Sequence, residues 1–251
     1  MSSSTYDSHL DRIGNRPGES LQNWLVRKMI DRALESTKPL PLSTIRALEV
    51  GPGVGRCAAE LLSRDIFYTA IEPTGRMRKN LLASFENNSK FEGVFPNLLP
   101  DVTGLPLAGY DLIVAMHVLE HTTDQYNARE FLSACKELLK PGGTIFIVCP
   151  DYADYKSVFF DIDWSHGYPT TTERIRGLLE DIGMQDVTSH GTRLASNSIL
   201  IKFACYILNT IIPYKILDQL FLRVLGDRLL ATGFSVGFLK RNVIAVGTKK
   251  L

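Results

Sequence analysis

Three glycines at alternate positions are the most informative chemical pattern in this chain of 251 residues. Gly51, Gly53 and Gly55 follow directly after the apolar run 47–50, and a helical pattern of apolar residues begins at Ala58. A turn of this kind between a strand and a helix points backbone N–H groups at a ligand, and the missing Cβ atoms permit close approach. The spacing therefore predicts a site for a nucleotide-type cofactor in an α/β sheet.

The same spacing excludes two other phosphate-binding motifs. The dinucleotide fingerprint G-x-G-x-x-G needs a glycine at position 56, where this chain has Arg56. The phosphate-binding loop G-x-x-x-x-G-K-[ST] needs Lys-Ser or Lys-Thr, and neither follows here. The remaining pattern is E-x-G-x-G-x-G, which begins at Glu49.

This pattern resembles the first motif of class I S-adenosylmethionine-dependent methyltransferases, and three more motifs follow in the family's order. The apolar run 68–71 ends in Glu72, the run 110–116 leads into Leu-Glu-His at 119–121, and residues 138–143 have the sequence LLKPGG. The resemblance covers about residues 46–151. It implies an α/β fold with a doubly wound, mostly parallel seven-stranded sheet, and S-adenosylmethionine as the cofactor.

The resemblance places cofactor contacts at the carboxyl ends of the first four strands. The glycines would surround the methionine part, Glu49 would contact its amino group, and Glu72 would accept hydrogen bonds from both ribose hydroxyls. The contact to the adenine edge is open between Asn97 and Asp101. The full set of candidate cofactor contacts is Glu49, Gly51, Gly53, Gly55, Glu72, Pro73, Asn97, Asp101, Met116 and His117.

A segment rich in acids and aromatics, residues 151–172, follows the fifth strand and is expected to form the acceptor wall. Within it, residues 165–170 (SHGYPT) resemble a stretch of many small-molecule and glycan methyltransferases. Methyl transfer to a hydroxyl needs positioning and a base, and His166 is the best-placed titratable group. The alternative is a histidine that only anchors the loop. His121 and Asp163 are the other catalytic candidates.

The residues His117, Glu120 and His121 raise the question of a metal site. The pattern H-x-x-E-H partly resembles the E-x-x-E-H-x-x-H site of small-RNA 2′-O-methyltransferases. Two positions depart from it, because His117 replaces the first glutamate and Asp124 replaces the last histidine. We therefore predict that the chain binds no metal.

Length and hydrophobic periodicity predict one α/β domain over residues 18–251, after a flexible arm at residues 1–17, and the resemblance implies that it is a methyltransferase domain. Between the last two strands lie residues 191–241, which we expect to form a mainly helical, hydrophobic insertion. The apolar run 199–212 is too short to span a bilayer, which needs about 20 residues. The segment 198–232 is expected to form part of the wall of the acceptor pocket and to leave an apolar face for a second copy, a membrane surface or the lipid part of the acceptor. The alternative is that its helices only pack on the domain as a cap over the active site.

Strands are expected at 46–50, 67–72, 91–95, 110–116, 143–149, 185–189 and 242–248, and helices at 20–34, 55–64, 74–84, 127–139, 171–182, 199–212 and 216–230.

Composition limits the function further. The formal net charge is +1, and no basic stripe with interleaved aromatics appears, so we expect no nucleic-acid partner. The four cysteines lack C-x-x-C spacing and the first residues lack a secretory pattern, which together predict a cytoplasmic protein, either free or peripheral at the inner membrane face.

The predicted function is transfer of the methyl group of S-adenosylmethionine to a small-molecule, glycan or lipid-linked acceptor, with oxygen favoured. The alternatives are a nitrogen or carbon acceptor and a catalytically silent cofactor-binding subunit of a partner enzyme.

Overall fold

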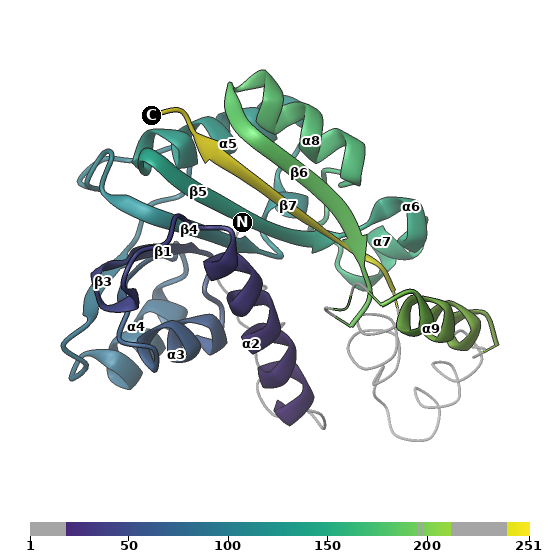
Figure 1. Ribbon diagram of the computed structural model, residues 1–251, viewed down its shortest axis with the longest axis horizontal. Coiled ribbons are helices and arrows are strands. Elements are labelled where there is room, and N and C mark those ends of the chain that lie inside the picture. The colour runs from purple at the N-terminus through teal and green to yellow at the C-terminus, as the bar shows by residue number, and fades with distance from the viewer. Residues whose placement is uncertain (1–18, 195, 197, 212–239) are drawn as a thin grey trace.

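The computed structural model describes residues 19–194, 196, 198–211 and 240–251. Its centre is a seven-stranded sheet with the order β3-β2-β1-β4-β5-β7-β6, covered by helices on both faces (Figure 1). Strands β1 to β5 run parallel, whereas β7 is antiparallel to both β5 and β6. The predicted fold class is confirmed.

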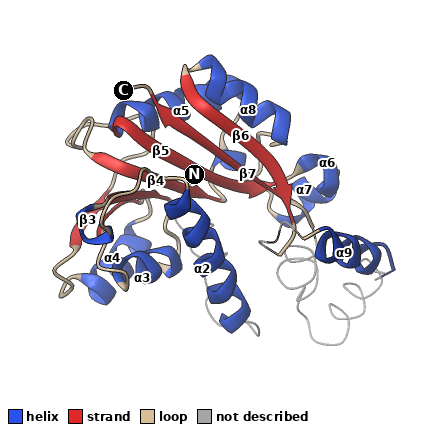
Figure 2. Cartoon of the chain, viewed as in Figure 1, coloured by secondary structure: helices blue, strands red, loops and turns tan. Residues whose placement is uncertain are grey.

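The arrangement of helices and strands along the chain is shown in Figure 2. The strands are β1 (Arg46–Val50), β2 (Phe67–Ile71), β3 (Phe91–Phe95), β4 (Tyr110–Met116), β5 (Leu139–Pro150), β6 (Met184–Thr192) and β7 (Asn242–Lys249). The helices are α2 (Glu19–Glu35), α3 (Arg56–Leu62), α4 (Gly75–Phe85), α5 (Gln125–Leu138), α6 (Tyr152–Tyr155), α7 (Val158–Ile162), α8 (Thr172–Asp181) and α9 (Ile199–Ile211), with two 3-10 turns, η1 (Leu42–Thr44) and η2 (Leu119–His121).

Alternating residues of each central strand pack into two separate hydrophobic layers, as the pleat requires. In β4, Leu112 and Val114 pack with α2 and α3, whereas Ile113 and Ala115 pack with α5 and α8. Both faces of the strand are therefore buried, which explains why its sequence is an apolar run without alternation.

The start of β5 differs from the prediction. The strand begins at Leu139, where Leu139 pairs with Tyr110 before the register shifts to Leu112 opposite Thr144. The bulge absorbs the Lys-Pro-Gly-Gly turn, in which Gly142 has a φ of 75°. The turn that was expected to precede the strand thus lies inside it.

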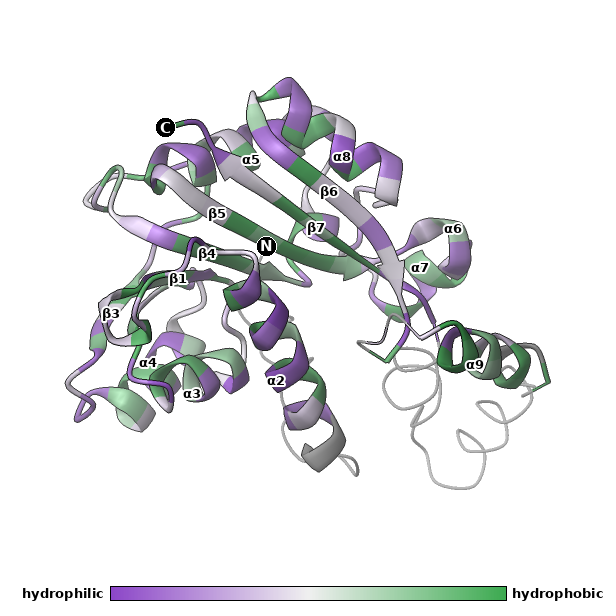
Figure 3. Ribbon diagram, viewed as in Figure 1, coloured by the Kyte–Doolittle hydropathy of each residue, from purple (hydrophilic) through white to green (hydrophobic). Residues whose placement is uncertain are grey.

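The insertion between β6 and β7 begins as predicted with an apolar helix, α9. Figure 3 shows hydrophobic colouring along most of this helix. The expected arm at residues 1–17 and the expected helix at 216–230 lie outside the described residues. Among the helices that the structure describes, none is both long and apolar enough to cross a membrane.

A buried carboxylate lies beneath the end of β1. The side chain of Glu49 is 3% exposed, and its Oε2 accepts a hydrogen bond of 2.5 Å from Tyr68 Oη in β2. Burial raises the pKa of Glu49 to about 7, against the opposing effect of hydrogen bonds from Tyr68 and Cys57. Because the folded pKa lies above the ordinary value of 4.5, this group favours folding most at low pH.

We predict that Glu49→Gln weakens the pH dependence of folding. Between pH 5 and pH 8 the parent's free energy of unfolding falls by about 2.5 kcal/mol through ionisation of Glu49. The reason is that the folded state binds this proton more tightly than the unfolded chain does, so removing the proton costs the folded state more. Urea unfolding of both proteins at the two pH values measures the difference. Glu86→Gln, at an exposed position, should retain the parent's dependence. Parallel pH profiles for the parent and Glu49→Gln would contradict the assignment.

Candidate cofactor and acceptor site

The carboxyl ends of β1, β2 and β4 meet at one edge of the sheet, because β1 pairs in parallel with the other two strands. Ligands in open α/β sheets bind outside this edge. The chain continues from these three strands into Gly51, Glu72 and His117 respectively, so the edge collects candidates that are far apart in sequence.

The glycine turn after β1 requires glycine for two different reasons. Gly51, Gly53 and Gly55 all have positive φ, at 69°, 53° and 81°. A Cβ on Gly51 would lie 2.7 Å from Val118 Cγ2, and one on Gly55 would lie 3.1 Å from side chains of α4. A Cβ on Gly53 would meet no heavy atom within 4 Å. Gly53 therefore faces open space, where a ligand can approach the backbone.

The carboxylate of Glu72 faces this glycine turn. The residue is 5% exposed, its Oε1 accepts the N–H of Thr74 at 2.8 Å, and it accepts a further hydrogen bond from the backbone of Gly53. Burial raises the pKa of Glu72, and these backbone donors oppose the rise. The neighbouring Pro73 is exposed. The structure thus brings together the acidic end of β2 and the most open glycine.

The two candidates for the adenine edge belong to a single turn after β3. Asn97 is buried, and its Nδ2 donates to Asp101 Oδ2 at 3.2 Å and to Thr103 O at 3.0 Å. Hydrogen bonds from Thr103, together with that of Asn97, hold the pKa of the exposed Asp101 below its ordinary value. The two residues are hydrogen-bonded neighbours.

The end of β4 supplies the last cofactor candidates. Met116 is half-buried, and His117 follows it with a φ of 57° while its N–H still donates to Val148 O at 2.7 Å. The His117 side chain is 54% exposed, and its Nδ1 lies 3.3 Å from Glu120 Oε1. His117 therefore contacts solvent on one side and a buried carboxylate on the other.

The acceptor wall is attached to η2 through the backbone. The N–H groups of Gly167 and Tyr168 donate to Glu120 O at 2.9 and 3.1 Å. A Cβ at position 167 would lie 2.6 Å from Thr122 O, so only glycine permits this approach. As a result, the ring centroids of His121 and His166 lie 5.0 Å apart.

The hydrogen bonds of the two rings fix their tautomers. The hydroxyl of Ser165 donates to Asp163 Oδ1 at 2.6 Å, so its oxygen accepts from His121 Nδ1 at 2.8 Å. His166 Nδ1 lies 2.6 Å from the carbonyl of Phe159, which can only accept. In the neutral form of each ring, therefore, Nδ1 carries the proton and Nε2 carries the lone pair. The predicted catalytic residues His121, Asp163 and His166 form one connected group.

Glu120 is the functional candidate that the sequence suggested only as a metal ligand. The residue is 1% exposed, and its Oε2 has no hydrogen-bond partner among the described residues. Burial alone would raise the pKa of Glu120, but the imidazoles of His117, His121 and His166 together hold it below its ordinary value. Burial lowers the pKa of His166.

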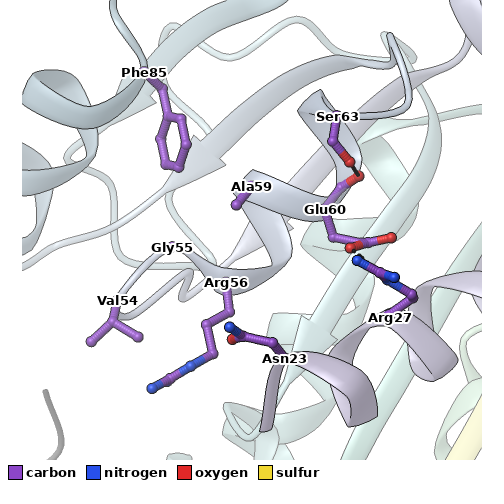
Figure 4. A pocket seen from close by; sticks show the side chains of 9 residues that line it. All are labelled: Asn23, Arg27, Val54, Gly55, Arg56, Ala59, Glu60, Ser63 and Phe85. Carbon is purple, nitrogen blue, oxygen red and sulfur yellow. Dashed lines mark hydrogen bonds and ion pairs between the residues drawn. The ribbon is translucent and has the colours of Figure 1, made fainter. Parts of the chain in front are cut away.

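A separate pocket of about 430 Å³ lies on the outer side of the glycine turn, between α2, α3 and α4 (Figure 4). It shares Gly55 with the candidate cofactor site and none of the other candidates. One side is closed by Arg27 Nε, which donates to Glu60 Oε2 at 3.3 Å. The lining residues are Asn23, Arg27, Val54, Gly55, Arg56, Ala59, Glu60, Ser63 and Phe85.

The sequence is similar to known methyltransferases over this part of the chain. Residues 48–145 match a family described as a methyltransferase domain. An uncharacterized methyltransferase of Mycobacterium bovis is 30% identical over 127 residues, which cover 51% of this chain and 60% of that protein. A ubiquinone biosynthesis O-methyltransferase of Methylocella silvestris is 31% identical over 108 residues, covering 43% of this chain and 41% of that protein. The chain thus spans less than two thirds of these relatives.

Solved structures extend the similarity to the whole fold. A SAM-dependent methyltransferase from Archaeoglobus fulgidus has a TM-score of 0.62 at 21% identity, and the match covers 92% of this chain and 97% of that chain. Residues 48–145 therefore match the methyltransferase domain family, and the chain as a whole has the Rossmann-like fold of S-adenosylmethionine-dependent methyltransferases.

Proposed function

We propose that this chain is an S-adenosylmethionine-dependent methyltransferase that methylates an oxygen atom of a small molecule or glycan. The observation that carries the proposal is that one sheet edge leads into both an open glycine turn and two neighbouring imidazoles whose Nδ1 atoms are engaged in hydrogen bonds, which leaves their Nε2 atoms for an acceptor. The family match supports methyl transfer, and the similarity to an O-methyltransferase supports oxygen as the acceptor atom.

The residues at the glycine turn fit S-adenosylmethionine. Gly53 leaves room for a ligand against the backbone, and the Glu72 carboxylate beside it offers acceptors for a ribose diol. We assign the amino group of the cofactor to Glu49 and the glycines, the adenine edge to the Asn97–Asp101 turn, and the walls of the site to Pro73, Met116 and His117. When bound, the cofactor supplies a methyl group with electrophilic character.

The chain's own residues then have to orient the acceptor and receive its proton. His166 and His121 each present a lone pair on Nε2, and burial keeps the pKa of His166 below its ordinary value, so this ring is neutral at pH 7. Asp163 and Ser165 hold the His121 ring in one orientation through Nδ1. A fixed base beside a fixed methyl donor contributes both proximity and proton transfer.

We assign the insertion, residues 191–241, to the acceptor side of the site. Asp154 of α6 accepts a hydrogen bond of 2.7 Å from Arg193 Nη2 and another of 2.8 Å from the N–H of Arg241. Both ends of the insertion are thereby fixed to the acceptor wall. Exposed apolar side chains on α9, among them Leu200 and Phe203, suit the lipid part of an acceptor, a membrane surface or a second copy.

We propose a cytoplasmic location, either free or at the inner membrane face. The four cysteines are free and buried in the structure, which agrees with a reducing compartment. A catalytically silent subunit is the alternative function, and release of S-adenosylhomocysteine in the presence of a metabolite mixture distinguishes the two. Tight cofactor binding without turnover would favour the silent subunit.

We predict that Glu72→Ala weakens S-adenosylmethionine binding by roughly 30- to 150-fold, which corresponds to about 2–3 kcal/mol for a charge-assisted contact to two hydroxyls. Isothermal titration calorimetry measures the affinity, and circular dichroism confirms that the variant is folded. Glu86→Ala, at the exposed position that follows α4, should leave the affinity unchanged. Unchanged affinity in a folded Glu72→Ala protein would remove Glu72 from the cofactor site.

We predict that His166→Ala lowers turnover by about 10²–10⁴-fold while the affinity for the cofactor stays constant, because the loss falls on acceptor activation. The matched control is His190→Ala, which removes a half-buried histidine of β6. Turnover near the parent's level in His166→Ala would leave this ring only a structural role, and attention would move to His121 and Asp163.

We predict that replacing residues 198–232 by a short linker spares cofactor binding and abolishes methylation, since the described ends of the insertion, Arg193 and Arg241, contact Asp154 of the acceptor wall. Cofactor affinity and product formation are measured on the same preparation. Methylation at the parent's rate by the deletion variant would show that the insertion takes no part in acceptor binding.

A further inference from the structure

Three side chains that can donate electron pairs to a metal ion lie close together after β4 and after α7. One ligand atom each from Glu120, His121 and His166 lies within 4.8 Å of the other two. In both rings Nδ1 is committed to a hydrogen bond, so the nitrogen that remains for a ligand is Nε2. Glu120 adds a buried Oε2 without a partner among the described residues. A buried carboxylate oxygen of this kind is costly unless a cation or a donor compensates it.

We infer that Glu120, His121 and His166 together bind one divalent transition-metal ion. Two imidazole nitrogens and one carboxylate oxygen are ligands typical of zinc and other first-row ions, whereas magnesium and calcium favour sites made of oxygen alone. Three protein ligands also leave coordination positions open, as in catalytic sites.

Contacts around the three side chains support a metal site, because each ligand is oriented by a further group. The Phe159 carbonyl accepts from His166 Nδ1, and the Ser165–Asp163 pair accepts from His121 Nδ1. Such partners fix the tautomer that presents Nε2 to a metal. His117 Nδ1 lies 3.3 Å from Oε1 of Glu120, so the other carboxylate oxygen, Oε2, remains available to bind the ion.

The sequence predicted no metal because H-x-x-E-H lacks two ligands of the known pattern. The structure supplies a ligand from elsewhere, since the loop after α7 places His166 beside His121. The resulting set has two histidines and one glutamate, so neither Asp124 nor a first glutamate is required. The absence of a continuous motif in the sequence therefore does not exclude the site.

A metal at this position deepens the proposed function, on which this step rests, and changes the role of the two histidines. With their Nε2 lone pairs bound to the ion, His121 and His166 would activate the acceptor through the metal and not as direct bases. An open coordination position would hold an acceptor hydroxyl and lower its pKa, so that the proton would pass to a solvent water before or during attack of the oxygen on the methyl carbon. The methyl–sulfur bond then breaks, and S-adenosylhomocysteine leaves with the bonding electron pair. Hydroxyls next to a second oxygen, as in catechols or sugar diols, suit such a site because both oxygens can reach the ion.

The experiment measures metal binding directly and without methyl transfer. The full chain, prepared without a histidine tag, is stripped with a chelator, dialysed against Zn²⁺ or Co²⁺ and assayed by elemental analysis and visible absorption. We expect one equivalent of metal and the absorption bands of a Co²⁺ site with nitrogen and oxygen ligands. Glu120→Gln and His166→Ala should weaken binding by at least 10-fold, whereas His190→Ala should bind like the parent.

The outcomes separate this inference from the proposed function. Less than 0.1 equivalent of Zn²⁺ in the parent, or equal metal content in the parent and both variants, overturns the metal site even if methylation proceeds. One equivalent of metal in a chain that transfers no methyl group overturns the proposed function and leaves the metal site standing. If His166→Ala does not fold, His121→Asn, at a half-buried position, provides the same comparison.

Discussion

The parallel pairing of β1 with β2 on one side and β4 on the other is the constraint on which the site depends. Because the three strands run the same way in register, their carboxyl ends lie at one edge, and the chain leaves each of them there. The glycine turn, Glu72 and the η2 turn can therefore act on one ligand although α3, α4 and β3 separate them along the chain. Any change that shifted β1 by one residue would exchange its two buried faces and separate these groups.

The elements that the sequence predicted correctly are those determined by local patterns. The apolar runs of β1 to β4 and the amphipathic stripe of α5 depend on neighbours a few residues away, so periodicity was sufficient. The helices α6 and α7 were not predicted, because four and five residues are too few to show a period. The bulge in β5 depends on pairing with β4, which the sequence alone does not reveal.

The candidate site likewise has features that the local sequence predicts and features that depend on contacts between distant residues. The sequence identified the types of residue at each strand end, and the structure shows that Glu72 reaches the glycine turn. The sequence alone could not show that the rings of His121 and His166 lie side by side. Their contact depends on hydrogen bonds from the N–H groups of residues 167 and 168 to Glu120 O. Nor could it give the partners of Glu120, whose burial depends on the whole loop. Charges buried in this way generally cost stability, which makes them informative about function.

The two ends of the insertion lie opposite each other, since Thr192 pairs with Asn242 and Asp154 contacts both flanking arginines. A segment whose ends already meet in a fixed frame can change in length at small entropic cost, because the closure penalty grows only with the logarithm of its length. The paired strands β6 and β7 therefore hold both ends of the insertion in place. A segment of another length or sequence can therefore be held between the same two strands without altering the sheet or the cofactor edge.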